Sequence, residues 1–219
     1  MTDIQLLTWA RGTGMQIAAS IFVLGIVVRL LEIFLLGRKR DLAEARGGQF
    51  GPGLRTVFTR SVPKVGTTKG TAFTYVAGYI FHIGFLLTLF FFTPHILFFK
   101  GLTGWSWPAL PVSLIDVCAV ISIAALVALL IHRFVDPVRR HLSGLGDYVS
   151  WVVTTLPLVT GYMALNRIGG EYNDLLVVHL LSVELLLVVL PFTKLIHAIT
   201  FVFSRWYNGA FAGRRGVRA

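Results

Sequence analysis

The sequence predicts an all-α membrane protein with five transmembrane helices. Of the 219 residues, 55% are hydrophobic and only 14% are charged, which is too little charge for the surface of a soluble domain of this size. A helix needs roughly 20 mostly apolar residues to cross about 30 Å of hydrocarbon. Five stretches meet this requirement, at residues 15–36, 72–99, 112–131, 149–166 and 174–203.

Each stretch has its own polar or helix-breaking residues. The first contains Arg29 and Glu32, which are three residues apart and can pair on one helix face. The second contains Pro94, and the third contains Cys118, the single cysteine of the chain. The fifth includes Glu184, whose carboxyl group we expect to be neutral or hydrogen-bonded.

A lone cysteine excludes an intramolecular disulfide and a cysteine-ligated iron–sulfur cluster within this chain. The sequence has no Cys-x-x-Cys-His motif, so any haem would be bound non-covalently. Met1–Gly14 lacks a basic segment and a small-residue cleavage site. We therefore expect no removable signal peptide and take the first helix as the anchor.

Residues 37–70 form the one long loop, and we expect a single domain over residues 1–219 because the other loops are short. Gly47-Gly48, Gly51-Pro52-Gly53 and Val62-Pro63 favour turns here over a long helix. The loop is either a solvated linker attracted to anionic lipid or a docking surface for a cytoplasmic partner subunit.

The cations are divided unevenly between the two sides of the predicted helices. Fifteen lie on the side of the long loop and the C-terminal tail: Arg38, Lys39, Arg40, Arg46, Arg55, Arg60, Lys64, Lys69, Arg133, Arg139, Arg140, Arg205, Arg214, Arg215 and Arg218. Three lie on the other side: Arg11, Lys100 and Arg167. This positive-inside pattern predicts an outside N-terminus and a cytoplasmic C-terminus. The net charge of +10 therefore indicates topology, and we expect no nucleic-acid partner.

Four of the six histidines, His82, His95, His179 and His197, fall in or at the rim of the second and fifth predicted helices. Ionisable residues in hydrocarbon are costly and usually functional. An imidazole that ligates iron has its acceptor nitrogen satisfied by the metal. Any one of these residues alone would be a core histidine bonded to a carbonyl, but two on each of two helices favour b-type haem.

The spacing of these histidines suggests how they would pair. His179 and His197 are 18 residues apart, which is five full turns of one helix, or about 27 Å along its axis. The predicted topology puts His95 and His179 near the outside and His82 and His197 near the cytoplasm. Depth therefore pairs His82 with His197 and His95 with His179.

The second helix does not fit this scheme as a regular helix. His82 and His95 are 13 residues apart, which is about 220° around an ideal helix and not one face. Pro94 removes a backbone donor directly before His95 and can bend or rewind the helix. We expect this proline to re-aim the His95 ring.

The residues resemble the gamma subunit of respiratory nitrate reductase and its relatives. The match is carried by Phe81-His82-Ile83-Gly84, by Pro191-Phe192-Thr193-Lys194-Leu195-Ile196-His197 and by the 18-residue step back to His179. The resemblance implies two b-type haems on four histidines, with quinol oxidised near the outer haem. It also implies a bacterial cytoplasmic membrane location and electron transfer to an iron–sulfur subunit on the cytoplasmic face, as part of a multisubunit oxidoreductase.

One position departs from the nitrate reductase pattern, because Phe92 stands where that family has its second histidine of the helix. This favours a relative that serves a heterodisulfide-reductase-like complex, a sulfite-reductase-associated complex or a membrane-linked hydrogenase. His132 is the reserve ligand if His95 does not bind iron, and His141 is expected to be solvated.

Other polar residues have weaker assignments. Arg29 and Lys194 are candidates to pair with haem propionates, although Lys194 also suits snorkelling. Lys100 and Asp116 flank the outer loop and could exchange protons with quinone, or they are ordinary interfacial charges. Trp105 and Trp107 suit an aromatic belt. Gly78, Gly84 and Gly161 suit close helix packing or approach of a porphyrin.

Two alternatives remain open from the sequence. The chain could bind one haem only, on His82 and His197. It could also be a small transporter or membrane scaffold that uses its histidines for metal or protons without haem.

Overall fold

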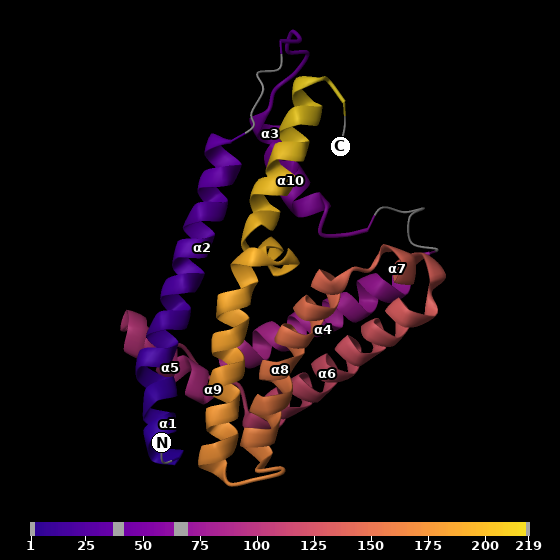
Figure 1. Cartoon of the computed structure of the whole chain (residues 1–219). Coiled ribbons are helices and arrows are strands. Elements are labelled where there is room, and N and C mark those ends of the chain that lie inside the picture. The colour runs from indigo at the N-terminus through magenta and orange to yellow at the C-terminus, as the bar shows by residue number, and fades with distance from the viewer. Residues whose placement is uncertain (1–2, 37–41, 64–69, 218–219) are drawn as a thin grey trace. The chain divides into compact units, whose positions relative to one another are not determined.

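The computed structural model describes residues 3–36, 42–63 and 70–217, and Figure 1 shows their course. Within these ranges every regular element is a helix. Six of the cations assigned to the cytoplasmic side lie outside the described residues: Arg38, Lys39, Arg40, Lys64, Lys69 and Arg218.

Five helical segments of the described chain are long and apolar enough to cross a membrane, which confirms the predicted fold class. The first, Asp3–Leu35, consists of α1 (Asp3–Trp9), a π-helix (Ala10–Gly14) and α2 (Met15–Leu35). The others are α4 (Ala72–Phe91), α6 (Val112–Val135), α8 (Leu145–Asn166) and Tyr172–Phe192, which begins with α9 (Tyr172–Val189). The orientation of these spans stays a prediction.

The remaining helices are shorter or more polar. They are α3 (Phe50–Thr59), α5 (Thr93–Thr103), α7 (Pro137–Leu142), the 3-10 turn Lys194–Ile196 and α10 (His197–Arg214). A further 3-10 turn, Leu190–Phe192, ends the fifth span.

Three predicted boundaries are wrong. The first helix begins at Asp3 and not at residue 15, because the segment before Met15 is itself helical. The predicted helix 72–99 is two helices, α4 and α5, separated at Phe92. The predicted helix 174–203 is also interrupted, since two 3-10 turns lie between α9 and α10.

The turn prediction for Gly51-Pro52-Gly53 is wrong as well, because these residues belong to the first turn of α3. Proline is tolerated there, since the first amides of a helix have no intrahelical acceptor.

The contacts divide the chain into two compact units, and each is described by itself. The first unit comprises Met1–Ile21 and Phe73–Val189, and the second comprises Phe22–Ala72 and Leu190–Ala219. The expectation of a single domain stays a prediction.

In the first unit, α8 packs against α6 and α9. Phe81, Ala125, Leu126 and Leu158 form a buried apolar cluster. Gly84 lies against α6, where an added Cβ would be 2.9 Å from the Cys118 carbonyl oxygen and in conflict with the Ser122 hydroxyl. Close helix packing thus explains this glycine. Small residues at membrane helix contacts generally allow the backbones to approach closely.

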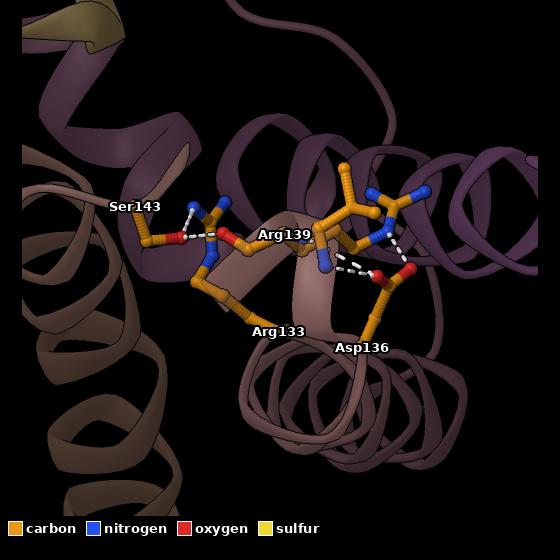
Figure 2. A network of polar contacts seen from close by, with 5 residues as sticks. Arg133, Asp136, Arg139 and Ser143 are labelled. Atoms are coloured by element: carbon orange, nitrogen blue, oxygen red, sulfur yellow. Dashed lines mark hydrogen bonds and ion pairs between the residues drawn. The ribbon is translucent and has the colours of Figure 1, made fainter. Parts of the chain in front are cut away.

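The loop between α6 and α8 uses cations that the sequence assigned to topology alone. Figure 2 shows the Arg133 guanidinium donating to Ser143 Oγ at 2.8 Å, and that hydroxyl donating to the Arg139 carbonyl at 2.6 Å. Asp136 caps α7 by accepting from the amides of Val138 and Arg139. Its other oxygen pairs with Arg139 Nε at 3.2 Å. Capping oxygens of this kind satisfy helix amides that have no other partner.

In the second unit, α3 packs on α10 through small residues. A Cβ added at Gly53 would be 2.7 Å from the Trp206 indole nitrogen, and one added at Gly209 would collide with Thr56. Arg205 fastens the end of α3 by donating to the Ser61 hydroxyl at 2.7 Å and to the Val57 carbonyl at 3.3 Å. The long loop therefore contains a short helix, α3, that packs against α10.

Candidate functional site

The break between α4 and α5 positions the first candidate ligand. Phe92 adopts an extended conformation, with φ −80° and ψ 129°, and Pro94 lies in the first turn of α5. The residue before the first helical position usually leaves the helical region, and a proline inside the first turn loses no hydrogen bond. One turn before His95 the helix therefore ends and a new helix begins, and the structure shows no smooth bend there.

Pro94 has no backbone N–H, so the Phe90 carbonyl, four residues earlier, lacks the donor that it would have in a continuous helix. Other groups replace that donor. The indole nitrogen of Trp107 donates to the Phe90 carbonyl at 2.6 Å. The Leu110 amide donates to the Phe91 carbonyl at 3.0 Å. Backbone carbonyls in a membrane must find partners inside the protein, so Trp107 helps to hold the break. Its assignment to an aromatic belt missed this role.

The His95 imidazole is anchored to the end of α4. Its Nδ1 lies 3.0 Å from the Thr88 carbonyl oxygen. Since a carbonyl only accepts, Nδ1 must carry the proton, and the lone pair of a neutral ring is then at Nε2. This is the arrangement that usually orients a metal-ligating histidine.

The His179 imidazole, on α9, is anchored to α8. Its Nδ1 lies 3.2 Å from the Thr160 hydroxyl oxygen. That hydroxyl also lies 2.7 Å from the Leu156 carbonyl, to which it donates. With the hydroxyl proton used in this way, Thr160 accepts from Nδ1–H, and the lone pair of His179 is also at Nε2.

Gly161 makes room for the His179 ring. A Cβ added there would be 3.0 Å from Cε1 and 3.2 Å from Nδ1 of the imidazole. By contrast, a Cβ at Gly78 would meet nothing within 4 Å. Of the three glycines singled out from the sequence, Gly161 is thus the one that contacts a candidate ligand.

The structure brings His95 and His179 together. Their ring centroids are 6.2 Å apart and their planes are inclined by 20°. The contacts of His95 with the Thr88 carbonyl and of His179 with the Thr160 hydroxyl are both made through Nδ1. Metal–imidazole bonds of about 2 Å on each side, plus about 1 Å from each nitrogen to its ring centre, give a separation of roughly 6 Å. Two anchored imidazoles at this distance fit a single metal ion, such as a haem iron.

His82 and His197 lie in different compact units. His82 Nδ1 is 2.6 Å from the Gly78 carbonyl, and His197 Nδ1 is 2.7 Å from the Lys194 carbonyl. Both side chains are exposed. The argument that His179 and His197 share one helix face is wrong, because the two 3-10 turns between them break the helical count.

The two propionate candidates belong to the second unit. Arg29 pairs with Glu32 at 2.7 Å, as the sequence predicts, and its Nε donates to the Pro191 carbonyl at 3.1 Å. A Cβ added at Gly25, one turn earlier on α2, would be 2.6 Å from the Pro191 side chain. Arg29 therefore stabilises the 3-10 turn that follows α9 by binding its Pro191 carbonyl. Lys194 is exposed at the start of the second 3-10 turn.

Lys100 and Asp116 are not joined by a hydrogen bond or an ion pair in the described chain. Lys100 is exposed in the last turn of α5. Asp116 is half-buried and accepts from the Asn166 amide at 2.8 Å. This amide contact gives Asp116 a structural partner at the end of α8.

Three further residues have separate positions. His132, the reserve ligand, lies with its ring edge against Phe73, with centroids 4.8 Å apart. His141 is exposed in α7. Glu184 is buried in α9. Within the described residues, no group of three or more histidine, cysteine, aspartate and glutamate side chains could hold a metal ion, so a metal here would depend on a pair.

Comparison with known proteins gives similarity without a family. No family model matches the chain, and no solved structure matches it. The chain is similar to a curated protein of Nitratidesulfovibrio vulgaris (strain Hildenborough), whose name is given only as "Protein", with 36% identity over 142 residues. These residues are 64% of this chain and 62% of that protein. The chain thus spans about three fifths of the length of this curated relative.

Proposed function

We propose that this chain is a b-type cytochrome of the bacterial cytoplasmic membrane that forms the electron-transfer subunit of a multisubunit oxidoreductase. The observation that carries the proposal is the pair of anchored imidazoles, His95 and His179, with ring centroids 6.2 Å apart. Both rings come from apolar segments, where an unsatisfied imidazole nitrogen is costly. A haem iron bound at both Nε2 atoms would satisfy them.

In this proposal the protein holds and orients the haem ligands. Thr88 and Thr160 fix the two Nδ1–H groups, and such contacts raise ligand basicity and set ring orientation. Gly161 admits the His179 ring next to α8. The haem, when bound, supplies one-electron redox chemistry at a potential that its axial ligands and surroundings tune.

A second haem on His82 and His197 is part of the proposal. Each of these rings has its Nδ1 held by the carbonyl of a residue three or four positions earlier in the chain. Arg29 and Lys194 are the candidates to pair with haem propionates. Such a haem would extend electron transfer toward the cytoplasmic face.

The electrons would pass between membrane quinone and an iron–sulfur subunit on the cytoplasmic face. The exposed cations Arg55, on α3, and Arg60 and Arg215, at the ends of α3 and α10, support a partner or a lipid surface of negative charge there. At the quinone, Lys100 and Asp116 would exchange protons with water. The complex served would be a nitrate reductase, a hydrogenase or a heterodisulfide-reductase-like enzyme.

The test is the haem content of the purified full-length chain. We expect a low-spin bis-histidine spectrum and two haems per chain. His95→Ala and His179→Ala should each remove one haem, whereas the exposed His141→Ala should remove none. One haem that is unchanged by His95→Ala would select the variant that uses His82 and His197 alone. A chain without Soret absorption would contradict the proposal and favour a transporter or scaffold.

A further inference from the structure

Glu184 is a buried carboxyl group that the proposed function does not use. Its residue is only 8% exposed, within the membrane-spanning helix α9. Its Oε1 is fully buried without a hydrogen-bond partner in the described chain, and no ion pair there includes Glu184. A buried carboxylate without a partner is costly, so the environment favours the uncharged acid.

The carboxyl group faces an irregular part of the first span. A Cβ added at Gly14 would be 2.8 Å from Glu184 Oε1 and 2.8 Å from the Trp9 ring. Gly14 ends the π-helix Ala10–Gly14, and π-helices are rare and frequently mark functional sites. The glycine therefore keeps open the space that the carboxyl group occupies.

No charged residue of the described chain forms an ion pair with this carboxyl group. The elements that pack against α9 are α1, the π-helix and α8. Their charged or titratable residues, with those of α9 itself, are Asp3, Arg11, Asp147, Tyr148, Tyr162, Tyr172, Asp174 and His179. None of them forms a hydrogen bond or ion pair with Glu184 among the described residues.

Glu184 lies on the same helix as the candidate ligand His179. Glu184 is five positions beyond His179, which is about 7.5 Å along the helix axis. The same step is about 140° around the helix, so the two side chains leave different faces of α9. In a low-dielectric medium charges still interact over such a separation. A change of charge at a site that includes His179 would therefore change the proton affinity of the Glu184 carboxyl group.

We propose that Glu184 is a proton-carrying site, protonated when the His95–His179 site is reduced and deprotonated when that site is oxidised. One electron arrives from quinol, and one proton from water binds the carboxylate oxygen, so the local net charge stays constant. Oxidation of the site returns both. This inference rests on the proposed function, because it requires a redox group at the histidine pair.

The experiment is redox-difference infrared spectroscopy of the full chain in lipid nanodiscs, with a haem titration at several pH values. Reduction of the wild type should produce a carboxylic-acid C=O band that Glu184→Gln loses. The reduction potential should depend on pH in the wild type and lose that dependence in Glu184→Gln. Glu171→Gln is the matched control, since this exposed glutamate lies just before α9, and it should behave as wild type.

Glu184→Asp keeps a titratable carboxyl group and should retain a band at a shifted position, which separates proton binding from a packing effect. A wild-type difference spectrum without any band that Glu184→Gln removes would overturn the inference, as would an unchanged pH dependence. A preparation without Soret absorption would refute the proposed function itself, and the coupling with it.

Discussion

The imidazole rings of His95 and His179 lie close together, with centroids 6.2 Å apart and planes 20° from parallel. His95 reaches this position because α4 ends at Phe91 and α5 starts a new direction at Thr93. His179 reaches it because Thr160 and Gly161 on α8 bind its nitrogen and leave space for its ring. The pair thus depends on a helix break and on one glycine, and both can be tested.

Gly161→Ala should weaken haem binding at this pair. The new Cβ would lie 3.0 Å from His179 Cε1, so the ring must shift from its anchored position. Changes in groups that support metal ligands typically cost about 10–100-fold in affinity, and we expect a loss of that size. The measurement is haem retention against a haem-scavenging protein. Gly146→Ala, on the same helix with open space around it, is the control, and equal retention by both variants would contradict the prediction.

Trp107→Phe should destabilise the break between α4 and α5. The variant leaves the Phe90 carbonyl without its 2.6 Å indole donor, and Pro94 cannot supply one. Loss of one hydrogen bond typically costs about 0.5–1.5 kcal/mol. Thermal unfolding in detergent should therefore show a lower midpoint for this variant. Trp105→Phe changes an exposed tryptophan, 79% accessible, and should leave the midpoint unchanged. A wild-type midpoint for Trp107→Phe would show that the indole bond does not stabilise the break.

The capping carboxylate Asp136 should make stability depend on pH. The Arg139 backbone amide, followed by smaller contributions that include Val138 and the Arg139 charge, lowers the pKa of Asp136 below its ordinary value of 3.8. A carboxyl group whose pKa is lower in the folded state stabilises that state above the unfolded pKa. It loses this contribution as the pH falls through the folded pKa.

The Asp136 contribution should therefore be complete at neutral pH and disappear below about pH 4. Unfolding midpoints measured across this range should converge for the wild type and Asp136→Asn at the acidic end. Glu44→Gln, an exposed residue, should follow the wild type throughout. A difference between Asp136→Asn and the wild type that is the same at every pH would rule out titration of this group.

The sequence predicts the spans better than their interruptions. Long apolar runs mark the five spans because hydrocarbon thickness fixes their length, and the Arg29–Glu32 pair follows from local helix spacing. A helix that is apolar on all sides carries no periodic signal for its ends. Pro94 therefore indicates a disturbance without stating whether the helix bends or ends there.

Donors distant in the sequence decide that outcome. Trp107 and Leu110 supply hydrogen bonds to the Phe90 and Phe91 carbonyls, and no local pattern around Pro94 specifies them. The interruption near Pro191 is similar, since Arg29, from the first span, binds the Pro191 carbonyl. The prediction that His179 and His197 share one helix face is wrong because the helix is interrupted near Pro191. The contact of His95 with His179, by contrast, depends on the interruption between α4 and α5.

The most direct test of the central claim is electron paramagnetic resonance of the oxidised, purified chain, compared with His95→Ala. Two imidazoles whose planes are 20° from parallel should give a rhombic low-spin ferric signal, and His95→Ala should remove this signal while the fold, measured by circular dichroism, is retained. The absence of a low-spin haem signal, or a His95→Ala spectrum that keeps every low-spin component of the wild type, would contradict the assignment of His95 and His179 as a haem ligand pair.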